Sequence, residues 1–254
     1  MPGRAFTTTG HIEQLRAEAD RFGVLLADAD LDATVVTCPD WTVRDLVRHV
    51  GGLHRWSTEL VSDGIVAETW RSSLPIVYPD EAAPVAVWRD WLVAGAADAC
   101  HTFLAAEPTR PVWAWGADQH ARYWPRRMLF ETAVHRIDLE VTLGAAPDLP
   151  VEVAAEGIDE QLENLPFVGR WNPKVAQLRG VGETIAFVAS DSGSWRVRLD
   201  PAGWWWDRGR DDDDVTAAGT ALELLLLLLG RPAPGISVSG DRALLDRWLA
   251  ATAF

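Results

Sequence analysis

The chain reads RRMLFETAVHRIDLEVTLG over residues 126–144, and this stretch predicts a long helix. It contains no Gly or Pro before Gly144, and its apolar residues recur at helical spacing. Glu131 and His135 stand four residues apart, about one helical turn, so their side chains project from the same face. A carboxylate and an imidazole on one helix face are candidates for two ligands of a metal ion.

A second helical stretch, TVRDLVRHVGGLHRW at residues 42–56, carries His49 far away in sequence. Two imidazoles and one carboxylate are enough to hold a catalytic zinc ion with one position left open. Asp45, one turn before His49, and Asp138, one turn after His135, are spaced to orient an imidazole through its second nitrogen. Each of these two aspartates is equally compatible with a plain surface charge.

Simpler interpretations compete with this hypothesis. An isolated Glu-x-x-x-His pair occurs by chance on many helices, where it contributes only about a few tenths of a kcal/mol. Apolar neighbours on both sides of the pair favour a polar stripe that points into the protein, where a metal would satisfy it. His54 is predicted to lie in a pocket or at the surface rather than to bind metal. The other histidines lack ligand-like spacing; they are His11, His101 and His120.

The N-terminal part of the chain predicts a helical bundle. Amphipathic stretches separated by Pro- and Gly-marked loops occupy residues 11–29, 42–62, 83–106 and 125–143. Thr42 is a predicted N-cap with Asp45 three residues later, a variant of the capping box. Four long helices with moderate loops indicate an antiparallel four-helix bundle. A further helix over residues 151–165 is predicted to lead out of the bundle.

The pattern changes after Pro166. Residues 184–189 and 195–199 alternate like strands around a turn, and 203–206 predict a third strand. A buried helix is predicted over 215–229, followed by a short strand at 236–238 and a last helix over 241–250. We therefore predict an α+β protein with a helical bundle over residues 1–166 and a small α+β domain over 167–254.

The composition limits the choice of partner and compartment. A formal charge of −14 argues against nucleic acid or an anionic membrane as a partner. Cys38 and Cys100, the only cysteines, indicate neither a disulfide framework nor a cysteine-type zinc site. The N-terminus lacks a signal-peptide core, and the longest apolar run, Leu224 to Leu229, is too short to span a bilayer. We expect a cytoplasmic protein, either a monomer or a homodimer.

Two motifs resemble a known family. The stretch VTCPDWTVRDLVRH at 36–49 and the stretch ETAVHRID at 131–138 are similar to the two signatures of the mycothiol-dependent maleylpyruvate isomerase family. That family is part of the DinB-like superfamily of metal-binding helical bundles. The resemblance extends over the chain, with a DinB-like bundle followed by a smaller C-terminal domain. The two motifs are specific for the family and much less so for the reaction.

The resemblance implies a site and its cofactors. It gives His49, Glu131 and His135 the positions of the family's metal ligands, usually for zinc. It also implies mycothiol, a small-molecule thiol of actinobacteria, which agrees with the Arg- and Ala-rich composition of a GC-rich genome. An arginine of the C-terminal domain assists the family's isomerase. Arg231 is the candidate for this catalytic role, and the alternatives are Arg196, Arg198 and Arg208.

The first functional hypothesis is a metal-dependent enzyme that handles a low-molecular-weight thiol. The metal would hold the cofactor sulfur as thiolate, which adds to an electrophilic carbon of a small-molecule substrate. Elimination after bond rotation would give an isomerase, and release of the adduct would give a transferase. Arg122, Arg126 and Arg127 are candidates to hold a substrate carboxylate, and His54 is a further candidate to contact the substrate.

Two other hypotheses stay open. A metal-bound water could perform hydrolysis or lyase chemistry without a thiol, with Asp45 or Asp138 as base. The chain could also be a small-molecule-binding protein that lacks turnover. The ligand set favours zinc, yet histidine and carboxylate also accept nickel, iron or manganese.

Overall fold

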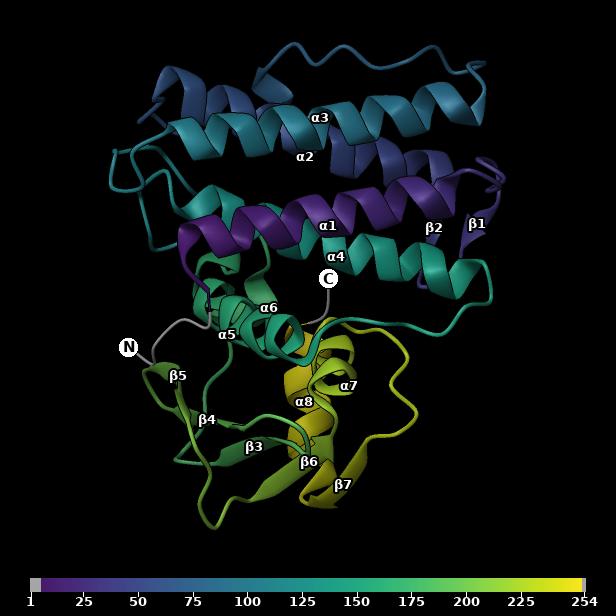
Figure 1. Cartoon of the computed structure of the whole chain (residues 1–254). Coiled ribbons are helices and arrows are strands. Elements are labelled where there is room, and N and C mark those ends of the chain that lie inside the picture. Colours follow the sequence, from purple (N-terminus) through teal and green to yellow (C-terminus); the bar gives the residue numbers. More distant parts are fainter. Residues whose placement is uncertain (1–5, 253–254) are drawn as a thin grey trace. The chain divides into compact units, whose positions relative to one another are not determined.

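The computed structural model describes residues 6–252, which form two compact units (Figure 1). The bundle unit comprises Phe6–Asp148, and the C-terminal unit begins at Leu149. Helices and a mixed sheet confirm the predicted α+β class. Among the described helices, none is long and apolar enough to cross a membrane.

Four long helices form the bundle unit, as predicted. They are α1 (Thr8–Leu26), α2 (Val43–Asp63), α3 (Val85–Ala105) and α4 (Tyr123–Thr142). Helix α1 packs against α3 and α4, and α2 packs against the same two helices. A short 3-10 helix, η1 (Arg71–Ser73), lies in the connection between α2 and α3. Each helix begins and ends within about three residues of its predicted bounds, which is ordinary for helix termini.

The start of α2 is fixed by its capping residues. The hydroxyl of Thr42 accepts a hydrogen bond from the backbone N–H of Asp45, and the Asp45 carboxylate accepts one from the backbone N–H of Thr42. This capping box confirms the prediction. The segment before it forms a strand, β2 (Cys38–Thr42), which pairs antiparallel with β1 (Thr34–Val35).

Helix α4 is buried along most of its length, although many of its side chains are polar. Arg136 is completely buried and pairs with Glu18 on α1 at 2.5 Å and with Glu140 at 2.5 Å. Its guanidinium also donates to the carbonyl of Asp148 at 2.6 Å. Because buried charges need partners, these bonds fix the rotation of α4 against α1 and so orient the face that carries Glu131 and His135.

A five-stranded mixed sheet with order β5-β4-β3-β6-β7 organises the C-terminal unit. Strands β3 and β6 are parallel, and the other neighbours are antiparallel. The strands are β3 (Thr184–Ala189), β4 (Ser194–Asp200), β5 (Gly203–Arg208), β6 (Val215–Gly219) and β7 (Ser237–Gly240). The helices are α5 (Val151–Val168), α6 (Pro173–Ala176), α7 (Ala221–Leu228) and α8 (Arg242–Thr252).

The single helix predicted over 215–229 is wrong. Residues 215–219 form strand β6, parallel to β3, and only 221–228 are helical. The two elements meet at Thr220, whose hydroxyl accepts from the backbone N–H of Glu223 while Glu223 bonds back to the N–H of Thr220. This capping box begins the helix at Ala221 and leaves the preceding residues free to join the sheet.

The boundary between the units lies near residue 149 rather than near 166, where we placed it. Helix α5 packs against α6 and α7 and therefore belongs to the C-terminal unit. Asp159 on α5 accepts a hydrogen bond from the indole N–H of Trp195 at 2.7 Å and pairs with Arg208 at 2.5 Å. These buried polar contacts join α5 to the sheet and explain why it does not continue the bundle.

Candidate metal centre

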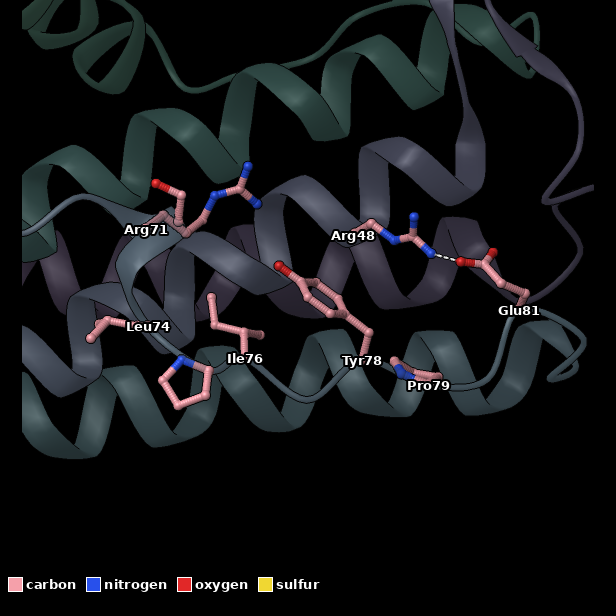
Figure 2. A pocket seen from close by; sticks show the side chains of 9 residues that line it. Arg48, Arg71, Leu74, Ile76, Tyr78, Pro79 and Glu81 are labelled. Atoms are coloured by element: carbon pink, nitrogen blue, oxygen red, sulfur yellow. Dashed lines mark hydrogen bonds and ion pairs between the residues drawn. The ribbon is translucent and has the colours of Figure 1, made fainter.

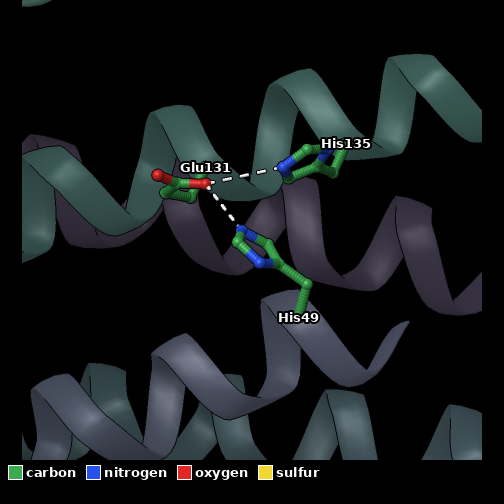
Figure 3. Close-up of side chains that lie close together, drawn as sticks. All are labelled: His49, Glu131 and His135. Carbon is green, nitrogen blue, oxygen red and sulfur yellow. Dashed lines mark hydrogen bonds and ion pairs between the residues drawn. The ribbon is translucent and has the colours of Figure 1, made fainter. Parts of the chain in front are cut away.

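Helices α2 and α4 bring the three predicted ligands together (Figure 3). His49 lies on α2, and Glu131 and His135 lie one turn apart on the same face of α4. One donor atom from each residue lies within 4.8 Å of the other two. The central expectation, that residues separated by some 80 positions converge, agrees with the structure.

Glu131 stands between the two imidazoles. Its Oε2 lies 3.4 Å from Nε2 of His49 and 3.6 Å from Nε2 of His135. The two imidazole ring centroids are 5.0 Å apart, and the rings are nearly perpendicular. Three nitrogen and oxygen donors therefore face one small volume, and all three side chains keep some contact with solvent, at 24%, 17% and 10% exposure for His49, Glu131 and His135.

These donors fit a divalent cation of the zinc type. Zinc bound at 2.0–2.1 Å by tetrahedral nitrogen and oxygen ligands separates neighbouring ligand atoms by about 3.3–3.4 Å. The two measured separations, 3.4 and 3.6 Å, are close to that edge length. They are long for ordinary hydrogen bonds. Three protein ligands and partial exposure leave a fourth position for a small molecule.

Asp138 orients His135. Its Oδ2 accepts a hydrogen bond from Nδ1 of His135 at 2.8 Å, and its Oδ1 accepts one from the hydroxyl of Thr37 at 2.6 Å. The carboxylate is completely buried. A proton held on Nδ1 leaves the lone pair of Nε2 directed toward Glu131, which is the tautomer that a metal ligand requires. The predicted contact between Asp138 and His135 is therefore present, and its role toward a metal stays a prediction.

Arg127 holds the other oxygen of Glu131. Its guanidinium pairs with Oε1 one turn away on α4 and lies 5.4 Å from the ring centroid of Trp115. We predicted that Arg127 contacts the substrate, but the structure shows it in contact with a ligand residue. Contact with the substrate stays a prediction, whereas the ion pair leaves Oε2 facing the two imidazoles.

The surroundings of the site favour the deprotonated forms of Glu131 and His49. Burial alone raises the pKa of Glu131, but Arg127, His49 and His135 outweigh that effect and hold the pKa well below its usual range. Burial lowers the pKa of His49, and this effect exceeds the opposing influence of Glu131. A carboxylate and a neutral imidazole are the protonation states in which these groups bind metal.

Trp41 covers one side of the site. Its ring centroid lies 4.9 Å from that of His49 and 5.6 Å from that of His135. We did not single out Trp41 or Thr37 from the sequence. Both lie inside the stretch 36–49 that resembles the first family signature, and this resemblance was the available signal. The β1-β2 hairpin brings the residues before His49 close to the candidate ligands.

Two residues predicted near the site have other roles. The carboxylate of Asp45 accepts hydrogen bonds from the backbone N–H of Thr42 at 3.0 Å and from its hydroxyl at 2.7 Å. The capping box therefore uses the carboxylate that we expected to orient His49. His54 is completely buried and bonds through Nε2 to the hydroxyl of Thr132 at 2.8 Å. It is therefore a core residue closed to substrate, contrary to the prediction.

The arginines proposed for the catalytic role lie in the C-terminal unit. Arg231 follows α7, and its guanidinium donates to the carbonyl of Leu229 at 2.6 Å. The alternatives pair with carboxylates, as Arg196–Asp207, Arg198–Asp200 and Arg208–Asp159. A role for any of them toward substrate stays a prediction.

Both units match domains of one protein family. Residues 12–140 match the mycothiol maleylpyruvate isomerase N-terminal domain, and residues 152–247 match the corresponding C-terminal domain. Among solved structures, the fold is similar to that of a mycothiol-dependent maleylpyruvate isomerase, with a TM-score of 0.63, 15% identity and coverage of 92% of this chain and 93% of that one. A histidine-to-alanine mutant of a mycothiol-dependent maleylpyruvate isomerase gives the same TM-score and coverage at 16% identity. No curated protein matches this sequence.

Proposed function

The chain belongs to the mycothiol maleylpyruvate isomerase family, and on that premise we propose that it is a divalent-metal enzyme that uses a low-molecular-weight thiol. Zinc is the preferred metal and mycothiol the preferred thiol. The reaction is isomerisation of an electrophilic small molecule or transfer of the sulfur to it. The convergence of His49, Glu131 and His135, with donor atoms within 4.8 Å of one another, carries this proposal.

The residues of the site have two proposed roles: some would hold the cation, and others orient the residues that hold it. His49, Glu131 and His135 would hold the cation. Asp138 fixes the tautomer of His135, and Arg127 holds the second oxygen of Glu131. A divalent cation held by these donors would lower the pKa of a thiol or water beside it.

The surroundings favour a thiol over water as the nucleophile. A metal-activated water benefits from a nearby free base, and we had named Asp45 and Asp138 for that role. Asp45 is used by the cap of α2, and Asp138 is completely buried between His135 and Thr37. A thiol that is deprotonated on binding needs no such base during the addition step. This difference supports the thiol-dependent reaction over hydrolysis.

Metal analysis and a thiol-dependence assay test the proposal. The purified protein is expected to carry about one equivalent of metal, and His49→Ala and His135→Ala should each lose it. Maleylpyruvate and other electrophiles carrying an activated double bond are then offered with and without mycothiol, and turnover should require the thiol. His101→Ala, which removes an exposed histidine on α3, is the matched control.

Each negative result of these assays points to a different hypothesis. Turnover that is equally fast without thiol would favour the thiol-free metal enzyme. Metal binding without turnover of any electrophile would favour the binding-protein hypothesis. A wild-type protein that does not retain zinc, nickel, iron or manganese would contradict both enzymatic hypotheses.

A further inference from the structure

A cleft of about 640 Å³ opens in the bundle unit between α2 and the segment that follows η1 (Figure 2). Arg48 of α2 and Arg71, Leu74, Ile76 and Tyr78 of the connecting segment contribute to its lining. A volume of this order suits a small organic ligand. The lining combines two arginines and a phenol with aliphatic side chains, so it offers both polar and apolar contacts.

Arg71 and Tyr78 converge on the backbone of α2 next to the metal centre. Gly52 lies three residues after His49 and therefore on the same face of α2. A Cβ atom at Gly52 would lie 2.9 Å from Nη1 of Arg71 and 3.1 Å from the hydroxyl oxygen of Tyr78. The missing side chain at Gly52 thus lets both polar groups reach this spot. Arg71 is also close enough to His49 for its charge to contribute to lowering the pKa of that histidine.

The positive charge of Arg71 lacks a partner in the cleft. Arg48, the other arginine, is paired with Glu81, the acidic residue of the lining. Within residues 6–252, no carboxylate forms an ion pair with Arg71. A half-buried guanidinium without a counterion, beside Gly52 and therefore near the proposed metal ligand His49, is well placed to receive an anionic group of a ligand.

The segment that carries these groups is held in place. The indole N–H of Trp91 donates to the carbonyl of Val77 at 3.1 Å, and the guanidinium of Arg44 donates to the carbonyl of Glu81 at 2.8 Å. The ring of Tyr78 packs against Trp91 with a centroid distance of 5.5 Å. The polar groups are therefore preorganised, which lowers the entropy lost when a ligand binds.

We propose that Gly52, Arg71 and Tyr78 form a carboxylate subsite that selects the substrate of the metal centre. Arg71 donates to the carboxylate, Tyr78 adds its hydroxyl, and Leu74 and Ile76 contact an apolar carbon skeleton. The substrate class is a monocarboxylate whose electrophilic carbon lies toward His49. The role in substrate selection rests on the proposed function, but binding of a carboxylate to the subsite can be measured without turnover.

The test compares an acid with its neutral amide. Isothermal titration calorimetry is performed on the full chain with its resident metal, using cinnamate and cinnamamide as probes. Wild type should bind cinnamate at least tenfold more tightly than cinnamamide. Arg71→Gln should remove this preference, and Arg71→Lys should restore part of it. Arg89→Gln, which removes an arginine of α3 paired with Asp90, should behave as wild type.

Gly52→Ala provides a second variant that spares the fold. Alanine favours a helix over glycine, and the atom nearest to the new Cβ is the end of the flexible Arg71 side chain, which can move away. The thermal midpoint should therefore stay equal or rise, while the affinity for cinnamate falls at least tenfold because Arg71 and Tyr78 are displaced.

Two results would overturn the subsite. One is equal affinity of wild type for acid and amide. The other is an acid preference that survives in both Arg71→Gln and Gly52→Ala, which would place the carboxylate on the metal or elsewhere. Metal content and thiol-dependent turnover, measured on the same preparations, show separately whether the proposed function holds.

Discussion

Asp138 is bonded to Nδ1 of His135, a proposed metal ligand, so we expect its buried carboxylate to set the tautomer of that histidine. In Asp138→Asn, the side-chain amide can turn its N–H₂ toward Nδ1 of His135 because Thr37 still donates to the other atom. The imidazole proton then moves to Nε2 and blocks the ligand position. We expect metal affinity to fall about 10–100-fold, measured by competition with a chelating dye.

The control for this change is Asp90→Asn, which alters an exposed aspartate on α3. It should leave metal affinity unchanged. An affinity in Asp138→Asn within about twofold of wild type would show that the buried carboxylate does not set the tautomer.

Arg127 acts on the same site through the charge of Glu131. In Arg127→Gln, the carboxylate loses the cation that lowers its pKa, while the effect of burial, which raises it, remains. Protons should then compete with metal at higher pH, so the midpoint of zinc release during acid titration should rise. Arg122→Gln, which breaks a pair with Asp118 off the metal centre, is the control, and equal midpoints in all three proteins would contradict the argument.

The convergence of the three candidate ligands and the contact between Asp138 and His135 could be predicted from sequence, whereas the contacts of Asp45 and His54 could not. Spacing of four on one helix is enough to place Glu131 and His135 on one face. The same spacing rule puts Asp45 near His49, but a carboxylate at the third position of a helix also fits a capping box, and that local bond wins. His54 failed because burial depends on which helix faces pack together, and a single helix does not reveal this.

Among the elements, α2 carries His49 and Gly52, and the Thr42 cap stabilises the N-terminus of this helix. Thr42→Ala removes the hydroxyl that accepts from the N–H of Asp45 at 3.2 Å. Loss of an N-cap costs about 0.5–2 kcal/mol, so the free energy of unfolding in urea should fall by about 1 kcal/mol at neutral pH. Thr102→Ala, in the last turn of α3, should change it much less.

The cap also has a pH signature. The backbone N–H and hydroxyl of Thr42 lower the pKa of Asp45 in the folded chain. A lowered folded pKa contributes stability that is present above the unfolded pKa, about 3.9, and is lost as pH falls through the folded value. The stability difference between wild type and Thr42→Ala should therefore shrink in strong acid, and a constant difference from neutral pH to pH 2 would contradict this origin.

Elements that end at Pro, Gly or a clear turn were predicted well, whereas the boundary between strand and helix within residues 215–229 was not. Helices α1 and α2 show clear helical stripes, and the alternation in β3 and β4 marks them as strands. Residues 215–229 are mostly Val, Ala and Leu, so periodicity does not separate a strand from a helix there. The Thr220–Glu223 capping box was the missed signal, since it begins the helix at Ala221.

At the scale of the whole molecule, the metal centre and the proposed subsite both lie within the bundle unit, and their geometry depends on how α2 and α4 pack. His54 lies in that interface, donating from Nε2 to Thr132, whose own hydroxyl donates to the carbonyl of Met128 at 2.7 Å. Burial lowers the pKa of His54 to about 3, so the residue stays neutral in the folded chain under mild acid.

This histidine makes the stability of the bundle sensitive to pH. In the unfolded chain the imidazole titrates near 6.5, so below that pH unfolding takes up a proton that the folded chain does not bind until about pH 3. The free energy of unfolding should fall by about 1.4 kcal/mol per pH unit from this residue across that window. His54→Gln keeps a donor for Thr132 but does not titrate, so its acid slope should be smaller by that amount.

Urea unfolding at several pH values between 4 and 8 measures both slopes, and His101→Gln controls for loss of an exposed histidine. Metal bound to His49, Glu131 and His135 also responds to acid, so the comparison is made on chelator-treated protein. A buried neutral imidazole predicts that, from pH 6.5 down to pH 4, the wild-type curve falls about 1.4 kcal/mol per pH unit more steeply than the His54→Gln curve, while their difference stays constant at higher pH. Parallel curves would mean that His54 is protonated as readily in the folded chain as in the unfolded one, and α2 and α4 would then have to pack more loosely around it.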